Sequence, residues 1–292
     1  MDMPKISVLM PVYNGEKYIG QAIRSVLNQT YRNFEIIIVD DNSQDRSPQI
    51  IQSFDDSRIK YFINEKNLGL TGNWNRCVNL GTAPYQTMLH QDDVMRKDNL
   101  QKKINCIETK GYRWVASDCY QIDSENKIIH NNWFRHHIAM SVKNKSRQTK
   151  FDKMFFVSNY FCFTTIMWER KLIEEIGLFT DKAGYCTDVN MWLKFMAKTD
   201  CYYIPEQLIF YRWAQNLSLK YDDYDWLYDD CLARKVVLDE LGLSLAYRLK
   251  FIALFGAMFL KYSILCFLDR KPNKVIKMLG GIFMLFHKPR NP

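Results

Sequence analysis

The chain has 292 residues, of which 47% are hydrophobic and 25% are charged, and this composition excludes an intrinsically disordered protein. The formal net charge is +8, but nine basic residues and a single acid lie between Leu245 and Pro292, so this C-terminal segment carries the whole excess. Residues 1–244 are formally neutral, which gives the main part of the chain no electrostatic drive toward nucleic acid. We therefore predict a folded domain that binds no nucleic acid, followed by a basic tail.

The 8 cysteines occur singly among apolar neighbours, and they form neither a C-x-x-C pair nor a Cys/His cluster with zinc-ligand spacing. This scatter favours buried free thiols in a reducing compartment over disulfides. The N-terminal residues run directly into a strand-like segment without a signal-peptide pattern. We therefore expect a cytoplasmic location.

Strand-like and helix-like segments alternate through the first part of the chain. Apolar runs rich in β-branched residues predict strands at residues 6–12, 34–39, 58–63, 85–89 and 114–117. Apolar residues at helical spacing predict helices at residues 16–29, 50–54, 74–80 and 98–109. This alternation predicts an α/β fold with a mostly parallel central sheet flanked by helices on both faces.

Residues 125–150 interrupt the alternation because they are polar and basic. We interpret them as an insertion or a mobile loop beside the site, with His136 and His137 on its surface. Regular patterning then resumes, with strands predicted at residues 161–168 and 202–211 and helices at residues 171–176, from Asp188 onward, and at 225–241.

Two aspartate doublets stand where apolar runs stop, Asp40-Asp41 after residues 34–39 and Asp92-Asp93 after residues 85–89. In open α/β sheets, ligands bind at the carboxyl ends of the strands. Carboxylate oxygens are ligands that Mg²⁺ and Mn²⁺ prefer, so the doublets predict a site for a nucleotide and a divalent cation. Turns or helix caps made by the same residues are the alternative that the spacing leaves open.

Several segments strongly resemble family 2 glycosyltransferases, and the resemblance extends from about Ile6 to Ser218. The segments with the most specific resemblance are Ile6 to Asn14, Ala22 to Tyr31 and Phe34 to Ser43. Asn67-Leu68-Gly69, Asn73-Trp74-Asn75 and His90-Gln91-Asp92-Asp93 resemble one bacterial branch of that family. The resemblance implies a GT-A fold, a nucleotide-sugar donor, a divalent cation and inversion at the anomeric carbon.

The same resemblance implies roles for residues at the nucleoside end of the donor. Pro11 and Tyr13 would line the base pocket, with Tyr13 placed to stack or pack on the base. Asp41 resembles the carboxylate that binds the base, and Asn67 is assigned with it to the nucleotide-sugar site.

At the other end of the donor, Asp92 and Asp93 match the family's D-x-D-type motif. The resemblance implies that Asp92 faces the donor ribose or sugar and that Asp93 holds Mn²⁺ or Mg²⁺. Gln91 stands where the usual motif has an acid, so metal binding is expected to rest mainly on Asp93.

Asp188 resembles the catalytic base of the family's E-D motif, with Thr187 in place of the glutamate. Single-displacement inversion requires such a base, because the acceptor hydroxyl must lose its proton as it attacks. A helix N-cap is the alternative for Asp188. Arg212 matches a family cation that helps neutralise the diphosphate, while the family's nearby histidine position is Ala214 in this chain.

Two apolar helical stretches, residues 248–268 and 275–286, lie within the basic tail. Lys261 and Lys277 interrupt them, which favours helices lying on the inner face of an anionic plasma membrane over two membrane spans. A soluble helical pair that packs on the domain is the alternative.

We therefore predict a GT-A glycosyltransferase domain at residues 1–220 and a helical, membrane-associating region at residues 221–292. The expected reaction moves a sugar from a nucleotide-sugar donor, expected to be UDP-linked, to a glycan or lipid-linked glycan acceptor in cell-surface polysaccharide synthesis. A catalytically inactive nucleotide-sugar or glycan-binding module at the membrane is one alternative. A nucleotidyltransferase of related fold is another, although residues 12–17 supply only one Gly and one Lys for a phosphate loop.

Overall fold

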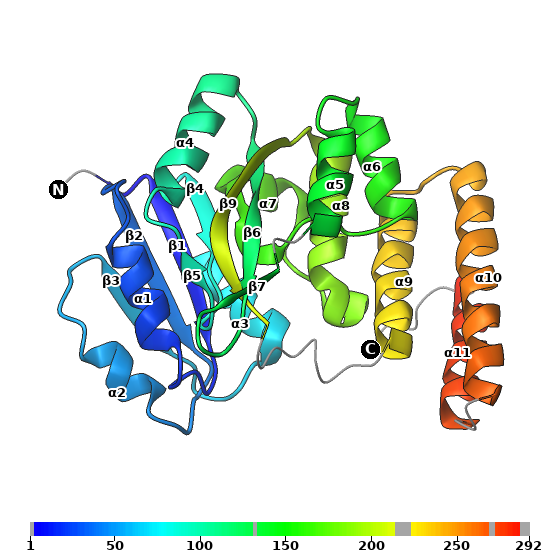
Figure 1. Ribbon diagram of the computed structural model, residues 1–292, viewed down its shortest axis with the longest axis horizontal. Coiled ribbons are helices and arrows are strands. Elements are labelled where there is room, and N and C mark those ends of the chain that lie inside the picture. Colours follow the sequence, from blue (N-terminus) through cyan, green and yellow to red (C-terminus); the bar gives the residue numbers. More distant parts are fainter. Residues whose placement is uncertain (1–2, 131–132, 214–222, 269–271, 287–292) are drawn as a thin grey trace. The chain divides into compact units, whose positions relative to one another are not determined.

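The computed structural model (Figure 1) describes residues 3–130, 133–213, 223–268 and 272–286. Within these residues, nine strands form one mixed sheet of order β3-β2-β1-β4-β8-β6-β9-β5, with β7 beside β6. The strands are β1 (Ile6–Val12), β2 (Phe34–Asp40), β3 (Ile59–Ile63), β4 (Tyr85–Met88), β5 (Val94–Met95), β6 (Trp114–Ile122), β7 (Ile128–His130), β8 (Ile166–Glu169) and β9 (Tyr202–Arg212). Strands β3, β2, β1 and β4 run parallel, as do β6 and β9, whereas β8 runs antiparallel to both β4 and β6.

The chain divides into two compact units. The first contains Met1–Lys150, Asn159–Leu178 and Phe195–Asn216, and the second contains Phe151–Ser158, Phe179–Lys194 and Leu217–Pro292. The whole sheet belongs to the first unit, together with the helices α1 (Ile19–Leu27), α2 (Ser47–Gln52), α3 (Gly69–Leu80), α4 (Asn99–Lys110), α5 (Trp133–Val142) and α7 (Arg170–Ile176) and the short 3₁₀ helix η1 (Phe163–Thr165). Helices α6 (Arg147–Phe156) and α8 (Thr187–Lys198) contribute residues to both units.

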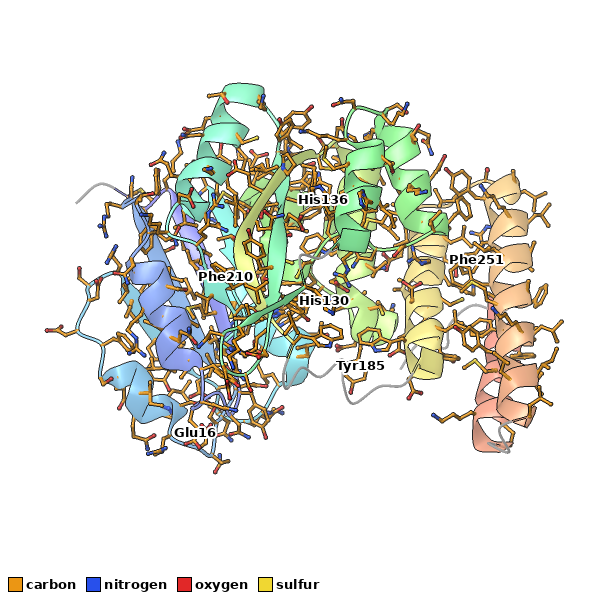
Figure 2. All side chains as sticks on the ribbon, in the orientation of Figure 1. Glu16, His130, His136, Tyr185, Phe210 and Phe251 are labelled. Carbon is orange, nitrogen blue, oxygen red and sulfur yellow. The ribbon has the colours of Figure 1, made fainter. Side chains whose placement is uncertain are left out.

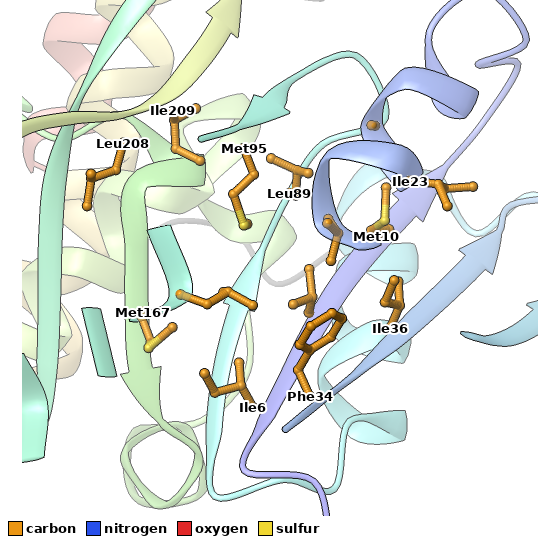
Figure 3. Packing of buried hydrophobic residues seen from close by; sticks show 14 of the residues in the cluster. Ile6, Met10, Ile23, Phe34, Ile36, Leu89, Met95, Met167, Leu208 and Ile209 are labelled. Atoms are coloured by element: carbon orange, nitrogen blue, oxygen red, sulfur yellow. The ribbon is translucent and has the colours of Figure 1, made fainter. Parts of the chain in front are cut away.

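The core of the first unit forms because β1 and β2 alternate their side chains between two faces of the sheet. Met10 on β1 and Phe34 and Ile36 on β2 face helix α1, which buries Ile23 against them (Figure 3). Each such fully buried side chain contributes about 1.5–3 kcal/mol of hydrophobic free energy. This packing fixes β1 beside β2, so that the carboxyl ends of both strands lie at the same edge of the sheet.

Of the two interpretations of residues 125–150, an insertion or a mobile loop, the mobile loop is wrong for the described residues. They form β7, α5 and the first turn of α6. The reason is a short apolar stripe: Ile138, Ala139 and Val142 are buried at helical spacing, between polar and basic residues that obscure the pattern.

The cysteine prediction is confirmed for seven of the eight residues. Their thiols are free and buried, and the side chain of the eighth, Cys266, lies outside the described residues. The seven are Cys77, Cys106, Cys119, Cys162, Cys186, Cys201 and Cys231.

The second unit is helical and contains the 3₁₀ helix η2 (Asp181–Cys186), α9 (Asp223–Glu240), α10 (Leu245–Leu268) and α11 (Pro272–Phe286). The Phe251 ring of α10, labelled in Figure 2, lies 5.9 Å from the Phe155 ring. Gly281 lets α11 approach α10 closely, because a Cβ there would stand 2.7 Å from the Phe259 ring. Within the described residues, no helix has the length and apolar character needed to cross a membrane.

Lys103 on α4 leads to a testable prediction about stability. Its side chain is fully buried, and its Nζ has no hydrogen-bond partner among the described residues. Burial lowers the pKa of Lys103 from 10.5 to about 7. Between these two pKa values the unfolded chain binds more protons than the folded chain. Burial of the ammonium therefore lowers the free energy of unfolding by its full amount below pH 7, and this destabilisation vanishes as the pH approaches 10.5.

We expect Lys103→Met to raise the free energy of unfolding at pH 7 by on the order of 2 kcal/mol, because the variant has no charge to desolvate. The difference from wild type should shrink toward pH 10. Urea unfolding at pH 7, 8.5 and 10 measures it, with the exposed Lys97→Met as the matched control. A stability difference that does not change with pH would contradict the prediction.

Candidate functional site

The carboxyl ends of β1 and β2 and the segment after β4 gather most of the predicted site residues at one edge of the sheet. Val12 pairs with Asp40 in the parallel register, and the backbone N–H of Asp41 donates to Val12 O at 2.7 Å. Pro11 is buried within β1 and pairs with Val39, while Tyr13 leaves the strand with 48% of its surface exposed. An exposed ring beside a buried carboxylate suits a planar, polar ligand such as a nucleobase.

Asp41 is 2% exposed and anchors the loop that precedes α3. Its Oδ1 accepts hydrogen bonds from Asn64 Nδ2 at 2.6 Å and from the Leu68 N–H at 2.7 Å, and its Oδ2 accepts from the Gly69 N–H at 3.0 Å. A carboxylate at the N-terminus of a helix is favoured by the helix dipole. Asn67 is exposed and donates to Asp41 O at 3.3 Å. The structure thus gives Asp41 a loop-ordering task, and its contact with a base stays a prediction.

The loop after β1 is held by the loop after β2. The backbone N–H groups of residues 14, 15 and 16 donate to Ser43 Oγ, Ser47 Oγ and Asp45 Oδ2 at 2.9, 2.8 and 2.9 Å. Glu16, labelled in Figure 2, forms an ion pair with Arg46 at 3.1 Å. These contacts order the backbone on which Tyr13 stands.

Asp93 has one buried carboxylate oxygen with a hydrogen bond and, among the described residues, one without. It is 1% exposed, its Oδ1 accepts from the Arg212 N–H at 2.9 Å, and its buried Oδ2 has no hydrogen-bond partner among the described residues. Burial, reinforced by the neighbouring Asp92 carboxylate, raises the pKa of Asp93 well above its usual range, although the Arg212 N–H and the Thr164 side chain oppose the rise. Burial also raises the pKa of Asp92, and the Arg212 charge opposes that rise.

This arrangement fits a divalent cation. Mg²⁺ in nucleotide sites takes one or two protein carboxylates and completes its shell with phosphate oxygens and water. The unpartnered Oδ2 of Asp93 and the adjacent Asp92 carboxylate supply that number of donors. Within the described residues, no group of three or more His, Cys, Asp or Glu side chains could hold a metal ion.

Arg212 lies at the end of β9 and is fully buried. Its Nε donates to Asp92 O at 2.8 Å, one terminal nitrogen donates to Asp123 O at 2.6 Å, and the other donates to Gln21 Oε1 and Asn126 Oδ1 at 3.0 and 2.7 Å. These bonds make Arg212 a structural anchor of the acidic edge. Its predicted contact with a diphosphate stays a prediction, and Ala214 lies outside the described residues.

His90 is the neutral member of a stack of aromatic rings beside Asp92 and Asp93. Its ring stacks on Trp74 at 5.4 Å and on Phe163 at 4.9 Å. Burial lowers the pKa of His90 to about 4, so the imidazole is neutral at physiological pH. The stacking holds the start of the turn that presents Asp92 and Asp93.

Asp188 belongs to the second unit, whereas the other seven predicted site residues belong to the first. It lies in the first turn of α8, is half-buried, and its Oδ1 accepts from the Val189 N–H at 2.8 Å. This contact is not that of an N-cap, because Asp188 lies inside α8 and accepts from the N–H of the next residue, whereas an N-cap accepts from an N–H two or three residues ahead. The role of Asp188 as a base stays a prediction.

Sequence reasoning missed two features of the first unit. Gln91, noted only as the replacement of an acid, pairs with the backbone of Tyr13 through both ends of its carboxamide, at 2.8 and 3.0 Å. His136, labelled on α5 in Figure 2, is half-buried, and its Nδ1 lies 2.8 Å from Asp118 Oδ2. Both contacts join residues distant in sequence, and no local pattern signals them.

Comparison with known proteins places this geometry in a family. Residues 7–177 match the model described as glycosyl transferase family 2. An uncharacterized glycosyltransferase of Rickettsia typhi is 30% identical over 209 residues, which cover 70% of this chain and 63% of that protein. The GalNAc(5)-diNAcBac-PP-undecaprenol beta-1,3-glucosyltransferase of Campylobacter jejuni is 28% identical over 216 residues, 72% of this chain and 65% of that protein.

The solved structure of S. aureus TarS residues 1–349 in complex with UDP-GlcNAc superposes with a TM-score of 0.71 at 17% identity, over 97% of this chain and 82% of that chain. This likeness confirms the predicted GT-A fold. The chain spans less than two thirds of the length of several curated relatives that it matches. Because the family model covers more than half of the chain, this protein belongs to glycosyl transferase family 2.

Proposed function

We propose that the protein is an inverting glycosyltransferase that moves a sugar from a UDP-linked donor to a glycan acceptor. The observation that carries the proposal is the buried, unpartnered Oδ2 of Asp93 beside Asp92, at the sheet edge where Tyr13 is exposed. Such an oxygen is costly to leave without a partner. A cation bound with a nucleoside diphosphate would supply that partner, and family membership supports this chemistry.

The donor would lie along the sheet edge. Tyr13, Pro11, Asp41 and Asn67 would receive the nucleoside, while Asp92 and Asp93 would face the diphosphate. A bound Mn²⁺ or Mg²⁺ would neutralise charge on the departing nucleoside diphosphate. The UDP-GlcNAc in the TarS structure supports the choice of a UDP-linked donor.

Asp188 would act as the base. The acceptor hydroxyl oxygen forms a bond to the anomeric carbon while the bond from that carbon to the diphosphate oxygen breaks on the opposite face. The hydroxyl proton passes to the Asp188 carboxylate, and the bonding electrons leave with the nucleoside diphosphate. Residues 1–220 would carry this reaction.

The acceptor is proposed to be a lipid-linked glycan in cell-surface polysaccharide synthesis. The Campylobacter relative, whose name specifies an undecaprenol-linked substrate, supports this class. Residues 221–292 would associate with the inner face of the plasma membrane, where such an acceptor lies.

Helices α10 and α11 of the second unit offer the surface for that association. Each helix exposes a line of large apolar side chains at helical spacing: Leu249, Leu260, Ile264 and Leu268 on α10, and Ile276, Leu279, Phe283 and Phe286 on α11. Lys250 and Lys261 are exposed on α10. Monomeric soluble domains rarely expose a large contiguous apolar patch, and adjacent lysines favour an anionic lipid surface.

Asp93→Asn is expected to lower the transfer rate by at least about 100-fold, because the amide cannot replace a carboxylate in holding a cation on the diphosphate. The measurement is release of UDP from UDP-sugars in the presence of membranes, titrated with Mn²⁺ or Mg²⁺. The exposed Asp55→Asn is the matched control and should keep wild-type rates. Equal metal dependence in wild type and Asp93→Asn would remove Asp93 from the metal site.

Asp188→Asn is expected to lower kcat by about 100-fold or more while UDP binding stays within twofold of wild type, because only proton transfer is lost. Calorimetric UDP titration and turnover of the same preparation separate the two effects, with the exposed Asp181→Asn as control. Full turnover by Asp188→Asn would remove this residue from the mechanism. Absence of UDP release from every donor by wild type would instead favour the inactive binding module.

The double substitution Ile276→Glu with Phe283→Glu is expected to weaken binding to vesicles containing phosphatidylglycerol by at least about tenfold, because two apolar side chains leave the lipid contact. These side chains are 69% and 63% exposed, so the folded unit should tolerate the change. Vesicle co-sedimentation measures binding, and Val157→Glu, 57% exposed outside both helices, is the control. Unchanged co-sedimentation of the double variant would contradict membrane docking through this surface.

A further inference from the structure

Gln91 joins the loop after β1 to the turn that carries the metal-binding doublet. Its Oε1 accepts a hydrogen bond from the Tyr13 N–H at 2.8 Å, and its Nε2 donates to Tyr13 O at 3.0 Å. The two bonds connect residues 78 positions apart. The carboxamide therefore pairs with Tyr13 as a neighbouring strand would, through one donor and one acceptor.

Gly15 makes room for this pairing. A Cβ at Gly15 would stand 2.5 Å from Gln91 Oε1 and 2.7 Å from Gln91 Cδ. The backbone of Gly15 is not in the positive-φ region, so left-handed conformation is not the reason for a glycine here. Contact with the Gln91 side chain explains the residue.

The chemistry of the pair requires an amide. An ionised carboxylate only accepts hydrogen bonds, so it could bond the Tyr13 N–H but would turn a second oxygen toward Tyr13 O. Gln91 stands where the family motif usually has an acid. Gln91 therefore adds no negative charge near the doublet. Instead it makes two hydrogen bonds to the Tyr13 backbone, on the nucleoside side of the proposed site.

Two separate sets of hydrogen bonds hold the loop after β1. Ser43, Ser47 and Asp45 fasten residues 14–16 to the loop after β2, as described above. Gln91 fastens Tyr13 to the doublet, because it precedes Asp92 directly in the chain. Movement of Tyr13 relative to Asp92 and Asp93 would break one or both Gln91 bonds.

We propose that Gln91 is a positioning residue that sets the spacing between the nucleoside end and the diphosphate end of the donor site. The identity of the ligand rests on the proposed function. Gln91 touches no reacting atom in this scheme, and its effect passes through the Tyr13 backbone. Gly15 is the second member of the device, because it keeps the space that Gln91 occupies.

Gln91→Ala and Gln91→Glu are expected to weaken UDP binding by about fivefold to tenfold, because each loses at least one hydrogen bond that holds Tyr13. Calorimetry in EDTA removes any contribution from a new metal ligand in Gln91→Glu. With metal present, KM for the UDP-sugar should rise while kcat stays within about threefold. Gln101→Ala, which removes the same side chain from a half-buried position on α4, should match wild type.

A double-mutant cycle tests the partnership with Gly15. Gly15→Ala alone should weaken UDP binding about as much as Gln91→Ala, because the new methyl group displaces the carboxamide. In the Gln91→Ala background the same methyl group should change binding by less than twofold, since the atoms it would contact are gone. Additive effects would overturn the proposal.

A ligand-free measurement separates this inference from the proposed function. Amide hydrogen exchange at Tyr13 should be faster in Gln91→Ala than in wild type or Gln101→Ala. Unchanged exchange would overturn the pairing itself. Faster exchange in a chain whose wild type binds no UDP would overturn the proposed donor and, with it, the role assigned to Gln91. Faster exchange together with weaker UDP binding in the Gln91 variants supports the proposal.

Discussion

The turn that carries Asp92 and Asp93 depends on the hydrogen bonds donated by the buried guanidinium of Arg212. A charge removed from water is tolerated only when its donors are satisfied, and here they are taken by Asp92 O, Asp123 O, Gln21 and Asn126. These partners come from helix α1, from the turn after β4 and from the connection between β6 and β7. One side chain from the last strand of the sheet therefore holds the Asp92 turn, the β6–β7 connection and helix α1 together.

The anchor has an electrostatic consequence. The positive charge of Arg212, which is hydrogen-bonded to the turn, opposes the rise in the pKa of the half-buried Asp92. The Asp93 carboxylate gains less, because its buried Oδ2 has no hydrogen-bond partner within the part of the chain that the structure describes. The turn after β4 thus places the buried Asp93 carboxylate beside the half-buried Asp92 carboxylate.

The sequence predicted the fold well in its first half and poorly in residues 125–150, for one physical reason. Buried parallel strands such as β1 and β2 are continuous apolar runs, and their helices repeat apolar residues over several turns. Helix α5 buries a single short stripe through Ile138, Ala139 and Val142, so its composition resembles that of a loop. The contact between Gln91 and Tyr13 was not predicted either, because the two residues are 78 positions apart and only the folded chain brings them together.

The sequence by itself determined that pairs of acids follow two strands of an α/β sheet, because β-branched runs and the residues that follow them are local properties. Only the structure shows that these strands, β2 and β4, lie on either side of β1. Their family motifs gave the expected roles for Asp41 and Asp93. Tertiary structure alone decided which of these groups have protein partners. Asp41 orders the loop before α3, while one buried oxygen of Asp93 has no hydrogen-bond partner among the described residues. Hydrogen-bond satisfaction depends on residues brought together from distant parts of the chain, and that information is absent from any single segment.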